Sequence, residues 1–267
     1  MQGYPYPMRP SHLKKISAGL FGSLFLTSCS SDEISGLGFE QGVTSVNDES
    51  LSLWQGAWIA AAVVGVVTLV LILWPVVFHR KKDEEFPKQT HENNFIEITF
   101  IIIPFLIVAV LFYFTVVKES KIVKVSPDSQ VSHIIDVNGF QWSWQFTYKE
   151  AGDFPAASVT GTPAQPPTLY LPQGKKVKFT INSNDVVHGF WIPAFMIQMQ
   201  NLPGVENYLE FTPNKLGTYP GRCNILCGRN HSQMLFSVKV VTPTEYQAYI
   251  QSLRDLNQVE IEKAATT

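Results

Sequence analysis

The stretch GRCNILCGRNHSQMLF, residues 221–236, brings two thiols, an imidazole and a thioether close together, at Cys223, Cys227, His231 and Met234. Thiolates and imidazoles bind copper and zinc well, and a thioether favours copper over zinc. Structural zinc sites use Cys and His alone, and their paired cysteines usually have the spacing C-x2-C. The spacing C-x3-C-x3-H-x2-M therefore predicts a copper site.

The second cysteine suggests a second metal ion, because a mononuclear blue-copper site needs only one Cys. Both sulfurs come from one loop, so two ions could share them as bridges. A further nitrogen should come from a separate strand, and the segment Asp185–Pro193 offers His188. The predicted donors are Cys223, Cys227, His188, His231 and Met234, with the main-chain carbonyl of Ile225 completing the set. A disulfide is the alternative for the cysteine pair in an exported domain.

The composition places the site in a chain with two unlike parts. Its 267 residues suffice for one ordinary domain with additional elements. The net charge of -2 gives no sign of a nucleic-acid partner. Three cysteines exclude a disulfide-rich scaffold. Residues 54–117 are dominated by two apolar runs, while residues 118–267 have the composition of a soluble domain.

The two apolar runs, Trp54–Phe78 and Phe95–Val117, predict a pair of membrane-spanning helices in contact with lipid. Each is long enough to cross a hydrocarbon core of about 30 Å at about 1.5 Å per residue. Basic residues are concentrated between the runs, at Arg80, Lys81, Lys82 and Lys88. The positive-inside rule therefore places the connecting loop in the cytoplasm and both termini outside.

Glu97 lies close to the predicted cytoplasmic end of the second helix. A carboxyl group inside a membrane helix is costly unless it is hydrated or paired, so it is a functional candidate by default. The alternative is an interfacial glutamate that reaches water, because Glu97 is only two residues inside the apolar run. Position alone does not separate these two interpretations.

The N-terminal segment has the layout of a signal peptide over residues 1–28. A basic stretch precedes a short apolar run, which is too short to span a bilayer. The ending Leu26-Thr27-Ser28-Cys29 resembles the lipobox of bacterial lipoproteins, in which Cys29 would be acylated. The alternative is a plain signal with an incidental cysteine. Residues 29–53 lack periodicity and predict an exposed, exported tether.

The region 118–241 predicts an all-β sandwich or barrel, because short β-rich runs alternate with Gly, Pro and Asn. Residues 242–267 predict a C-terminal helix and tail. Thr242 or Thr244 could cap this helix, and its apolar residues recur at helical spacing. The predicted strands are Lys121–Val125, Val131–Val137, Phe140–Tyr148, Leu169–Leu171, Lys176–Asn182, Val187–Ile192, Tyr208–Thr212, Gly217–Gly221 and Leu235–Val241.

Residues 50–241 together resemble subunit 2 of the haem–copper cytochrome c oxidases. The resemblance rests on C-x3-C-G-x2-H-S-x-M with D-x-x-H upstream, and on GFQWSW at Gly139–Trp144. It implies a cupredoxin-like fold for the β-domain and a dinuclear copper A centre held by the donors named above. It also implies a bacterial plasma-membrane protein with the copper domain on the outer face. Glu97, seven residues before Pro104, matches a helix-2 glutamate at the entry of a proton channel.

The resemblance further implies a function in respiration. Reduced cytochrome c would give electrons one at a time to copper A, with Trp142 as the first relay. The electrons would then reach haem in subunit 1, where oxygen is reduced to water and protons are pumped. Subunit 3 is a further expected partner. This chain contains no recognisable haem-attachment motif, so haem is expected only in the partner subunit.

Two departures from the family concern magnesium and the electron donor. Ile225 stands where the family usually has a Glu whose carboxylate helps to hold magnesium, and Gln200 stands where it has an Asp. We therefore do not predict bound magnesium. The exported domain is not markedly acidic, so the donor could be a soluble cytochrome c or one bound to the membrane or to a complex.

Two other functions compete with this interpretation. Subunit 2 of a quinol oxidase shares the hairpin and fold but lacks the copper ligands that are present here. A lipoprotein that stores or delivers copper would need one membrane attachment at most and no aromatic relay.

Overall fold

The computed structural model describes residues 38–80, 89–152 and 157–266, with side chains described as far as residue 256. Nearly all of these residues belong to one compact unit, Glu40–Thr267. The predicted signal peptide at 1–28, the predicted lipidation site Cys29 and most of the predicted cytoplasmic loop lie outside the described residues.

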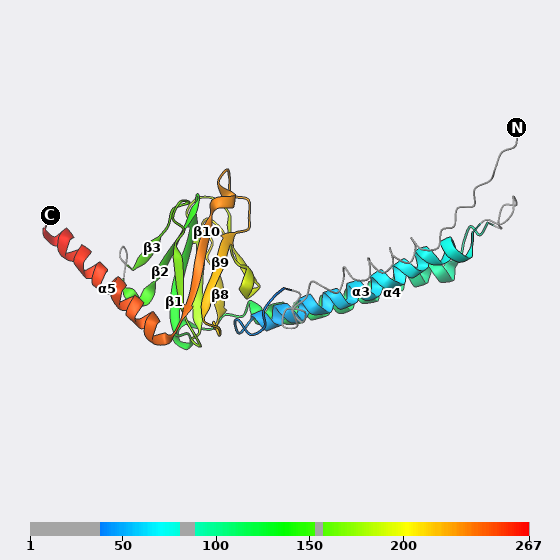
Figure 1. The fold of residues 1–267 in the computed structure, drawn as a ribbon, viewed down its shortest axis with the longest axis horizontal. Coiled ribbons are helices and arrows are strands. Elements are labelled where there is room, and N and C mark those ends of the chain that lie inside the picture. Colours follow the sequence, from blue (N-terminus) through cyan, green and yellow to red (C-terminus); the bar gives the residue numbers. More distant parts are fainter. Residues whose placement is uncertain (1–37, 81–88, 153–156, 267) are drawn as a thin grey trace, which may run out of the picture. The chain divides into compact units, whose positions relative to one another are not determined.

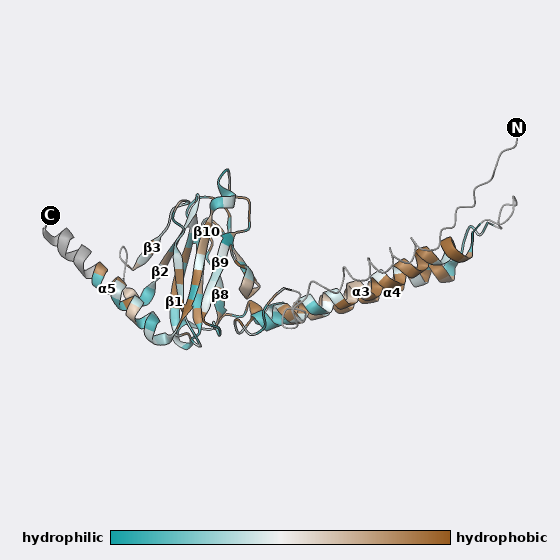
Figure 2. Ribbon diagram, in the orientation of Figure 1, coloured by the Kyte–Doolittle hydropathy of each residue, from teal (hydrophilic) through white to brown (hydrophobic). Residues whose placement is uncertain are grey.

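Two long helices, α3 (Asn47–Phe78) and α4 (Asn94–Ile122), run side by side (Figure 1). Both are apolar along most of their length, as Figure 2 shows, and most of their apolar side chains are exposed. By length and composition, both could cross a membrane. Pro75 and Pro104 lie inside these helices without ending them.

The second helix is longer than predicted at its C-terminal end. α4 continues through Lys118 and Lys121 to Ile122, so the predicted strand at Lys121–Val125 is wrong. The two lysines lie one turn apart on one face of the helix, and both form ion pairs with Glu49 of α3. This pairing favours helix over strand, because the helical spacing presents both lysines to one carboxylate.

The described residues before α3, 38–46, do not form the exposed tether that their composition predicts. Val43, Thr44 and Asn47 are buried. The Ser45 backbone N–H donates to the Thr212 carbonyl at 2.9 Å, and the Ser45 hydroxyl accepts from the Thr212 N–H at 3.0 Å. The sequence does not indicate this attachment, because it is made largely by backbone groups, which every residue type carries.

The β-domain is a sandwich of two five-stranded sheets (Figure 1), which confirms the predicted fold class. The first sheet has the order β3 (Ser158–Thr160), β2 (Ser143–Tyr148), β1 (His133–Phe140), β5 (Val177–Ser183), β8 (Asn207–Phe211). The second sheet has the order β4 (Thr168–Pro172), β10 (Leu235–Val241), β9 (Gly217–Cys223), β6 (His188–Ile192), β7 (Ile197–Asn201). The pairs β1–β5 and β4–β10 are parallel, and the other neighbours are antiparallel.

An aromatic core joins the two sheets. Trp144 and Phe146 of β2 make edge contacts with Phe190 of β6 and Phe236 of β10, with ring centroids between 5.2 and 6.4 Å apart. Phe190 and Phe236 stack on each other at 5.0 Å. Such ring pairs stabilise a core beyond the area that they bury, and this cluster lies directly behind the strands that carry His188 and Cys223.

The C-terminal helix α5 (Pro243–Thr266) begins with a reciprocal cap. The Thr242 hydroxyl accepts from the Glu245 N–H at 3.3 Å, and the Glu245 carboxylate accepts from the Thr242 N–H at 2.9 Å. Of the two predicted caps, the structure therefore selects Thr242. Tyr246 and Ile250 are fully buried against the β-domain, so α5 covers part of the core.

Glu210 of β8 anchors the connection between α4 and the β-domain. Its carboxylate accepts from the Ser126 N–H at 2.6 Å and the Ser126 hydroxyl at 2.8 Å, and pairs with Lys176 at 3.1 Å. Burial raises the pKa of Glu210, but these partners outweigh burial and hold the pKa below its usual value. The ionised carboxylate therefore stabilises the folded chain.

We predict that Glu210→Gln lowers stability at pH 7 by about 1 kcal/mol, since charged hydrogen bonds are lost. The folded pKa lies below the reference value of 4.5. The contribution is therefore present above the unfolded pKa and is lost as the pH falls through the folded pKa. Unfolding of the full chain in mild detergent, followed from pH 7 to 3, should show wild type and variant converging in acid. Glu206→Gln, an exposed carboxylate bonded to Tyr208, is the control; an equal effect of both variants would contradict the prediction.

Candidate metal centre

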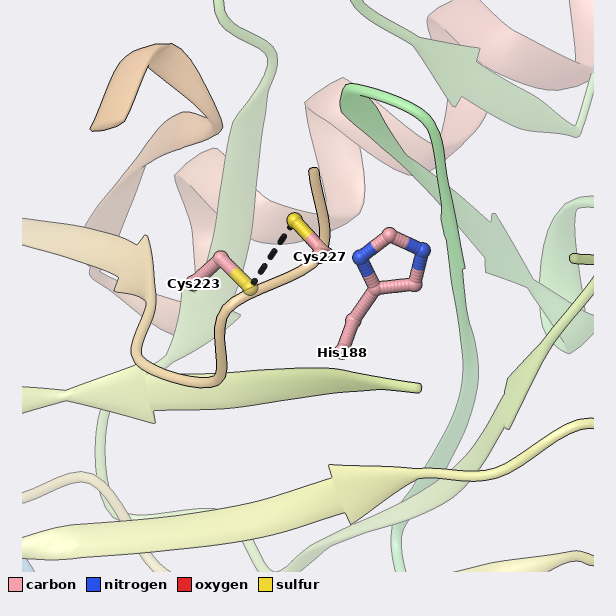
Figure 3. Close-up of side chains that lie close together, drawn as sticks. All are labelled: His188, Cys223 and Cys227. Carbon is pink, nitrogen blue, oxygen red and sulfur yellow. Dashed lines mark hydrogen bonds between the residues drawn. The ribbon is translucent and has the colours of Figure 1, made fainter. Parts of the chain in front are cut away.

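The predicted donors come from two adjacent strands and one loop. His188 opens β6 and Cys223 ends β9, and these strands are paired, with Phe190 opposite Cys223. The segment Cys223–Met234, called the ligand loop below, then leads into β10. Figure 3 shows the His188 imidazole and the two cysteine sulfurs turned toward a common point. The sheet register therefore brings together His188 and Cys223, which are 35 residues apart in the sequence.

The ligand loop folds its donors onto one another. The Sγ atoms of Cys223 and Cys227 are 3.8 Å apart, and both cysteines are buried and free. The Cys227 sulfur lies 3.6 Å from His231 Nδ1 and 3.7 Å from Met234 Sδ. The Cys223 sulfur lies 3.2 Å from the Ile225 carbonyl oxygen.

His188 and the two cysteines have ligand atoms within 4.8 Å of one another. Among the described residues, no other group of three or more His, Cys, Asp and Glu side chains is arranged in this way. All six predicted donors thus lie in one cluster, and the structure holds the two thiols apart rather than in a disulfide.

His188 is oriented by Asp185. Its Nε2 lies 2.8 Å from Asp185 Oδ1, and its Nδ1 is buried without a hydrogen-bond partner. Burial raises the pKa of Asp185, but the hydrogen bond to His188 and two backbone N–H groups outweigh this and lower it. Because an ionised carboxylate only accepts, Nε2 carries a proton, and Nδ1 is the ring nitrogen left to face the cysteines. Nδ1 is therefore the atom of His188 that could bind a metal.

The two thiols have opposite tendencies to ionise. Burial opposes ionisation of Cys223, but the nearby His188 and the Gly189 N–H outweigh it and lower its pKa to about 6. Burial and the charge of Cys223 raise the pKa of Cys227 to about 12. Two thiolates at this separation repel each other strongly unless a cation lies between them. The donor set therefore fits copper, which binds thiolate, imidazole and thioether.

Two glycines let the ligand loop approach its neighbours. A Cβ on Gly189 would lie 1.9 Å from the Asn224 side-chain oxygen, so a larger residue would push the loop away from β6. Gly228 has φ +120°, and a Cβ there would lie 3.1 Å from the side-chain nitrogens of both Gln141 and Trp142. At these two positions the site depends on the absence of a side chain.

Trp142, the predicted electron-entry residue, lies against the ligand loop. Its indole N–H donates to the Cys227 carbonyl at 3.2 Å, and the ring is partly exposed. The neighbouring Gln141 side chain donates to the same carbonyl at 2.9 Å. The Gln141 backbone N–H also donates to Asp185 at 2.7 Å. The β1–β2 turn therefore contacts both the cysteine side and the histidine side of the cluster.

Two supporting residues were not predicted as part of the site. Besides Gln141, Trp144 donates its indole N–H to the Met234 carbonyl at 3.4 Å, and its ring centroid lies 6.3 Å from that of His188. The sequence signal for both is the segment Gly139–Trp144, which contains them as well as Trp142. The two tryptophans differ because Trp142 lies in the turn before β2, whereas Trp144 lies within β2 and is fully buried in the core behind the donors.

Glu97 lies far from the ligand loop in sequence, in the first turn of α4. Its carboxylate accepts from the Asn93 N–H at 3.4 Å, while the Asn93 side chain accepts from the Ile96 N–H at 3.2 Å. This reciprocal arrangement caps the helix N-terminus. The structure thus gives Glu97 a local role, and its place at a proton-channel entry stays a prediction.

The two positions at which the family pattern has a magnesium-binding Glu and Asp carry no carboxylate. Gln200 is exposed on β7, and its strand neighbour Gln198 accepts a hydrogen bond from the Asn224 side chain. Ile225 contributes an aliphatic side chain. Magnesium prefers carboxylates, and Gln200 supplies an amide oxygen instead.

Comparisons with known proteins agree with this architecture. Residues 133–241 match the family model of the cytochrome c oxidase subunit II periplasmic domain. The chain is 39% identical to the probable cytochrome c oxidase subunit 2 of Streptomyces avermitilis, over 94% of this chain and 89% of that relative. It is 34% identical to the cytochrome c oxidase subunit 2 of Mycobacterium tuberculosis, over 89% and 81%.

A solved structure is also similar in part. The periplasmic domain of cytochrome oxidase subunit II from Bradyrhizobium japonicum is 25% identical, with a TM-score of 0.43, over 47% of this chain and 96% of that one.

The fold and the buried sulfur–imidazole cluster define a membrane-anchored β-sandwich with a candidate site for a soft metal. The two apolar helices and the matched periplasmic domain fit an anchored protein whose β-domain lies outside the membrane. The chain belongs to the cytochrome c oxidase subunit 2 family, a family of oxidoreductase subunits.

We predict that Asp185→Asn lowers copper affinity by about 10- to 100-fold, the range for loss of a partner that orients a metal-binding His. Asparagine can donate to Nε2 and so favours the other His188 tautomer. Copper retention by the full chain against a series of chelators would measure the effect. Asp136→Asn, which breaks a surface pair with Lys149, is the control. Equal copper retention by the Asp185 variant and wild type would contradict the role of Asp185.

Proposed function

We propose that this chain is the electron-accepting subunit of a cytochrome c oxidase and that it holds a dinuclear copper A centre. The proposal rests on one observation: two buried, free thiols lie 3.8 Å apart within a cluster of imidazole, thioether and carbonyl donors. The proposed donors are His188, Cys223, the Ile225 carbonyl, Cys227, His231 and Met234. Family membership supports copper as the metal and an oxidase as the assembly.

A dinuclear copper centre held by the donors named above would supply a one-electron carrier. The chain's own residues hold those donors in place. Asp185 fixes the His188 proton on Nε2, and Gln141 ties Asp185 to the Cys227 carbonyl. Trp144 fixes the Met234 main chain from behind. Donors held this way have little freedom to move when charge changes.

Electrons enter, in this proposal, through Trp142. Its ring is partly exposed, while its N–H contacts the carbonyl of a proposed ligand, Cys227. A cytochrome c that docks over this ring would be connected to the ligand loop by one hydrogen bond. The donor is either soluble or bound to the membrane or to a complex.

The remaining partners follow from the same proposal. Haem in subunit 1 receives the electrons, oxygen is reduced to water there, and the complex pumps protons; subunit 3 completes the expected core. We propose that α3 and α4 both cross the bacterial plasma membrane, with the β-domain outside. Glu97 is then at the cytoplasmic end of α4, where a carboxyl group could take up protons.

We predict that Cys223→Ser and His188→Ala each abolish the mixed-valence near-infrared absorption of the copper-loaded chain. Each change removes a donor that no other described side chain can replace. Absorption and electron paramagnetic resonance after copper loading would test this, with copper counted by elemental analysis. His91→Ala, a change at an exposed histidine before α4, is the matched control.

Survival of the absorption in either ligand variant would show that the proposed donor is not a ligand. Absence of copper from the full chain, with electrons accepted directly from quinol, would instead favour the quinol oxidase function. Copper retention without co-purifying haem would favour a copper-storage protein.

We predict that Trp142→Phe lowers the rate of electron transfer from reduced cytochrome c by about tenfold or more, while the copper spectrum is retained. Phenylalanine keeps an aromatic ring but loses the N–H that contacts the Cys227 carbonyl. Stopped-flow oxidation of cytochrome c by the assembled complex would measure the rate. Trp58→Phe, on α3, is the control; an unchanged rate in the Trp142 variant would exclude Trp142 as the entry point.

A further inference from the structure

A polar pocket of about 530 Å³ lies where the segments flanking α3 and α4 meet the β-domain. Its lining includes three lysines, Lys121, Lys124 and Lys176, and one acid, Glu210. The Ser126 hydroxyl and the Gln130 side chain add polar groups. The pocket takes no part in the proposed copper site, which is built on β6 and the ligand loop.

The lysines leave this pocket with a net positive charge. Glu210 is already engaged by Ser126 and Lys176. Lys121 pairs with Glu49 but remains more than half exposed. Lys124 is exposed and forms no ion pair with any residue of the part of the chain that the structure describes. Glu49 also pairs with Lys118, which lies outside the pocket lining. The lysines therefore outnumber the two carboxylates beside them, Glu210 and Glu49, both of which are already paired, and this excess of positive charge favours an anionic ligand with several acceptor oxygens, such as a phosphodiester.

The pocket lies at the end of the proposed membrane spans. The apolar run of α4 gives way to Lys118 and Lys121 in its last turns, and α4 ends at Ile122. Trp54, near the start of the apolar part of α3, is of a residue type that favours the membrane–water boundary. The three lysines of the pocket are therefore at the depth of phospholipid headgroups on the outer face.

An apolar groove of about 850 Å³ lies one helical turn away. Lys118 lines this groove and Lys121 lines the polar pocket, and Glu49 pairs with both lysines. Three residues along α4 correspond to about 4.5 Å. The apolar walls of the groove come from both helices, at Leu53, Trp54, Gly56, Ala57, Val110, Leu111 and Phe114.

We propose that the pocket and the groove together hold one anionic phospholipid, with its phosphate among Lys121, Lys124 and Lys176 and an acyl chain against Ala57 and Phe114. The inference rests on the proposed insertion of α3 and α4 in the membrane. The adjoining groove favours a lipid over free phosphate, because inorganic phosphate would leave the apolar walls uncovered. The bound lipid would join the hairpin to the β-domain.

Lipid retention by the full chain tests this proposal. The copper-loaded chain in mild detergent is incubated with equal amounts of phosphatidylglycerol and phosphatidylcholine, separated from free lipid, and weighed by native mass spectrometry. We expect one retained phosphatidylglycerol per chain and about tenfold less phosphatidylcholine. Millimolar inorganic phosphate should not displace the lipid.

Two variants address the two halves of the site. Lys124→Glu reverses a charge that has no ion-pair partner among the described residues, and should lower phosphatidylglycerol retention about fivefold or more. Ala57→Phe fills the groove without changing charge and should lower retention similarly. The matched controls are Lys239→Gln, on β10, and Ala62→Phe, on α3 outside the groove lining; both should retain the lipid.

Four results would overturn the proposal: equal retention of both lipids, unchanged retention in Lys124→Glu, displacement by inorganic phosphate, or no lipid in the assembled oxidase. The last would mean that another subunit covers the pocket. The near-infrared copper spectrum is recorded on every sample. Its loss in wild type would count against the proposed copper function alone, because lipid retention is measured independently.

Discussion

The close approach of the ligand loop to strand β6 is the constraint on which the site depends. Cys223 can face His188 only because β6 and β9 are neighbours in one sheet and because Gly189 has no side chain. The aromatic core behind these strands holds both of them through Phe190 and Phe236. A close-packed core of this kind resists small displacements. It therefore keeps the donors at their positions although no disulfide joins Cys223 and Cys227.

Hydrogen bonds also hold the donors of the cluster in place. A continuous path runs from His188 to Asp185, then to Gln141, and then to the carbonyl of Cys227. The turn between β1 and β2 therefore belongs to the first sheet but orients donors from the second. One consequence is that Trp142, the proposed electron-entry residue, is held by the same turn that orients the proposed donors.

The membrane side of the β-domain is attached by a different kind of interaction. Glu49 forms ion pairs with two lysines of α4. Ser45 forms two hydrogen bonds with Thr212, the residue after β8. These contacts are polar and partly exposed, so each contributes little by itself. The basic pocket at this junction concentrates positive charge where a headgroup phosphate would strengthen the attachment.

Much of the fold and nearly all of the proposed donors could be predicted from the sequence, because their signals are local. Apolar runs of sufficient length predict α3 and α4, alternating β-rich runs predict the sandwich, and the spacing of soft ligands predicts the loop. The errors occurred where long-range contacts outweighed local pattern. Lys121–Val125 has strand composition, yet Glu49 on another helix favours continuation of α4 through Lys121. The segment around Ser45 has tether composition, yet it is held by a backbone hydrogen bond to Thr212, the residue after β8.

The sequence by itself determined which donors are present, in what order, and that carboxylates are missing at Ile225 and Gln200. Residue type and spacing are sufficient for those conclusions because they describe chemistry within one segment. Only the tertiary structure decided that His188 meets Cys223, that Trp144 and Gln141 support the donors, and that Lys176 joins Lys121 and Lys124 in one pocket. Those relations join residues far apart in the chain, and only strand register and side-chain packing bring them together.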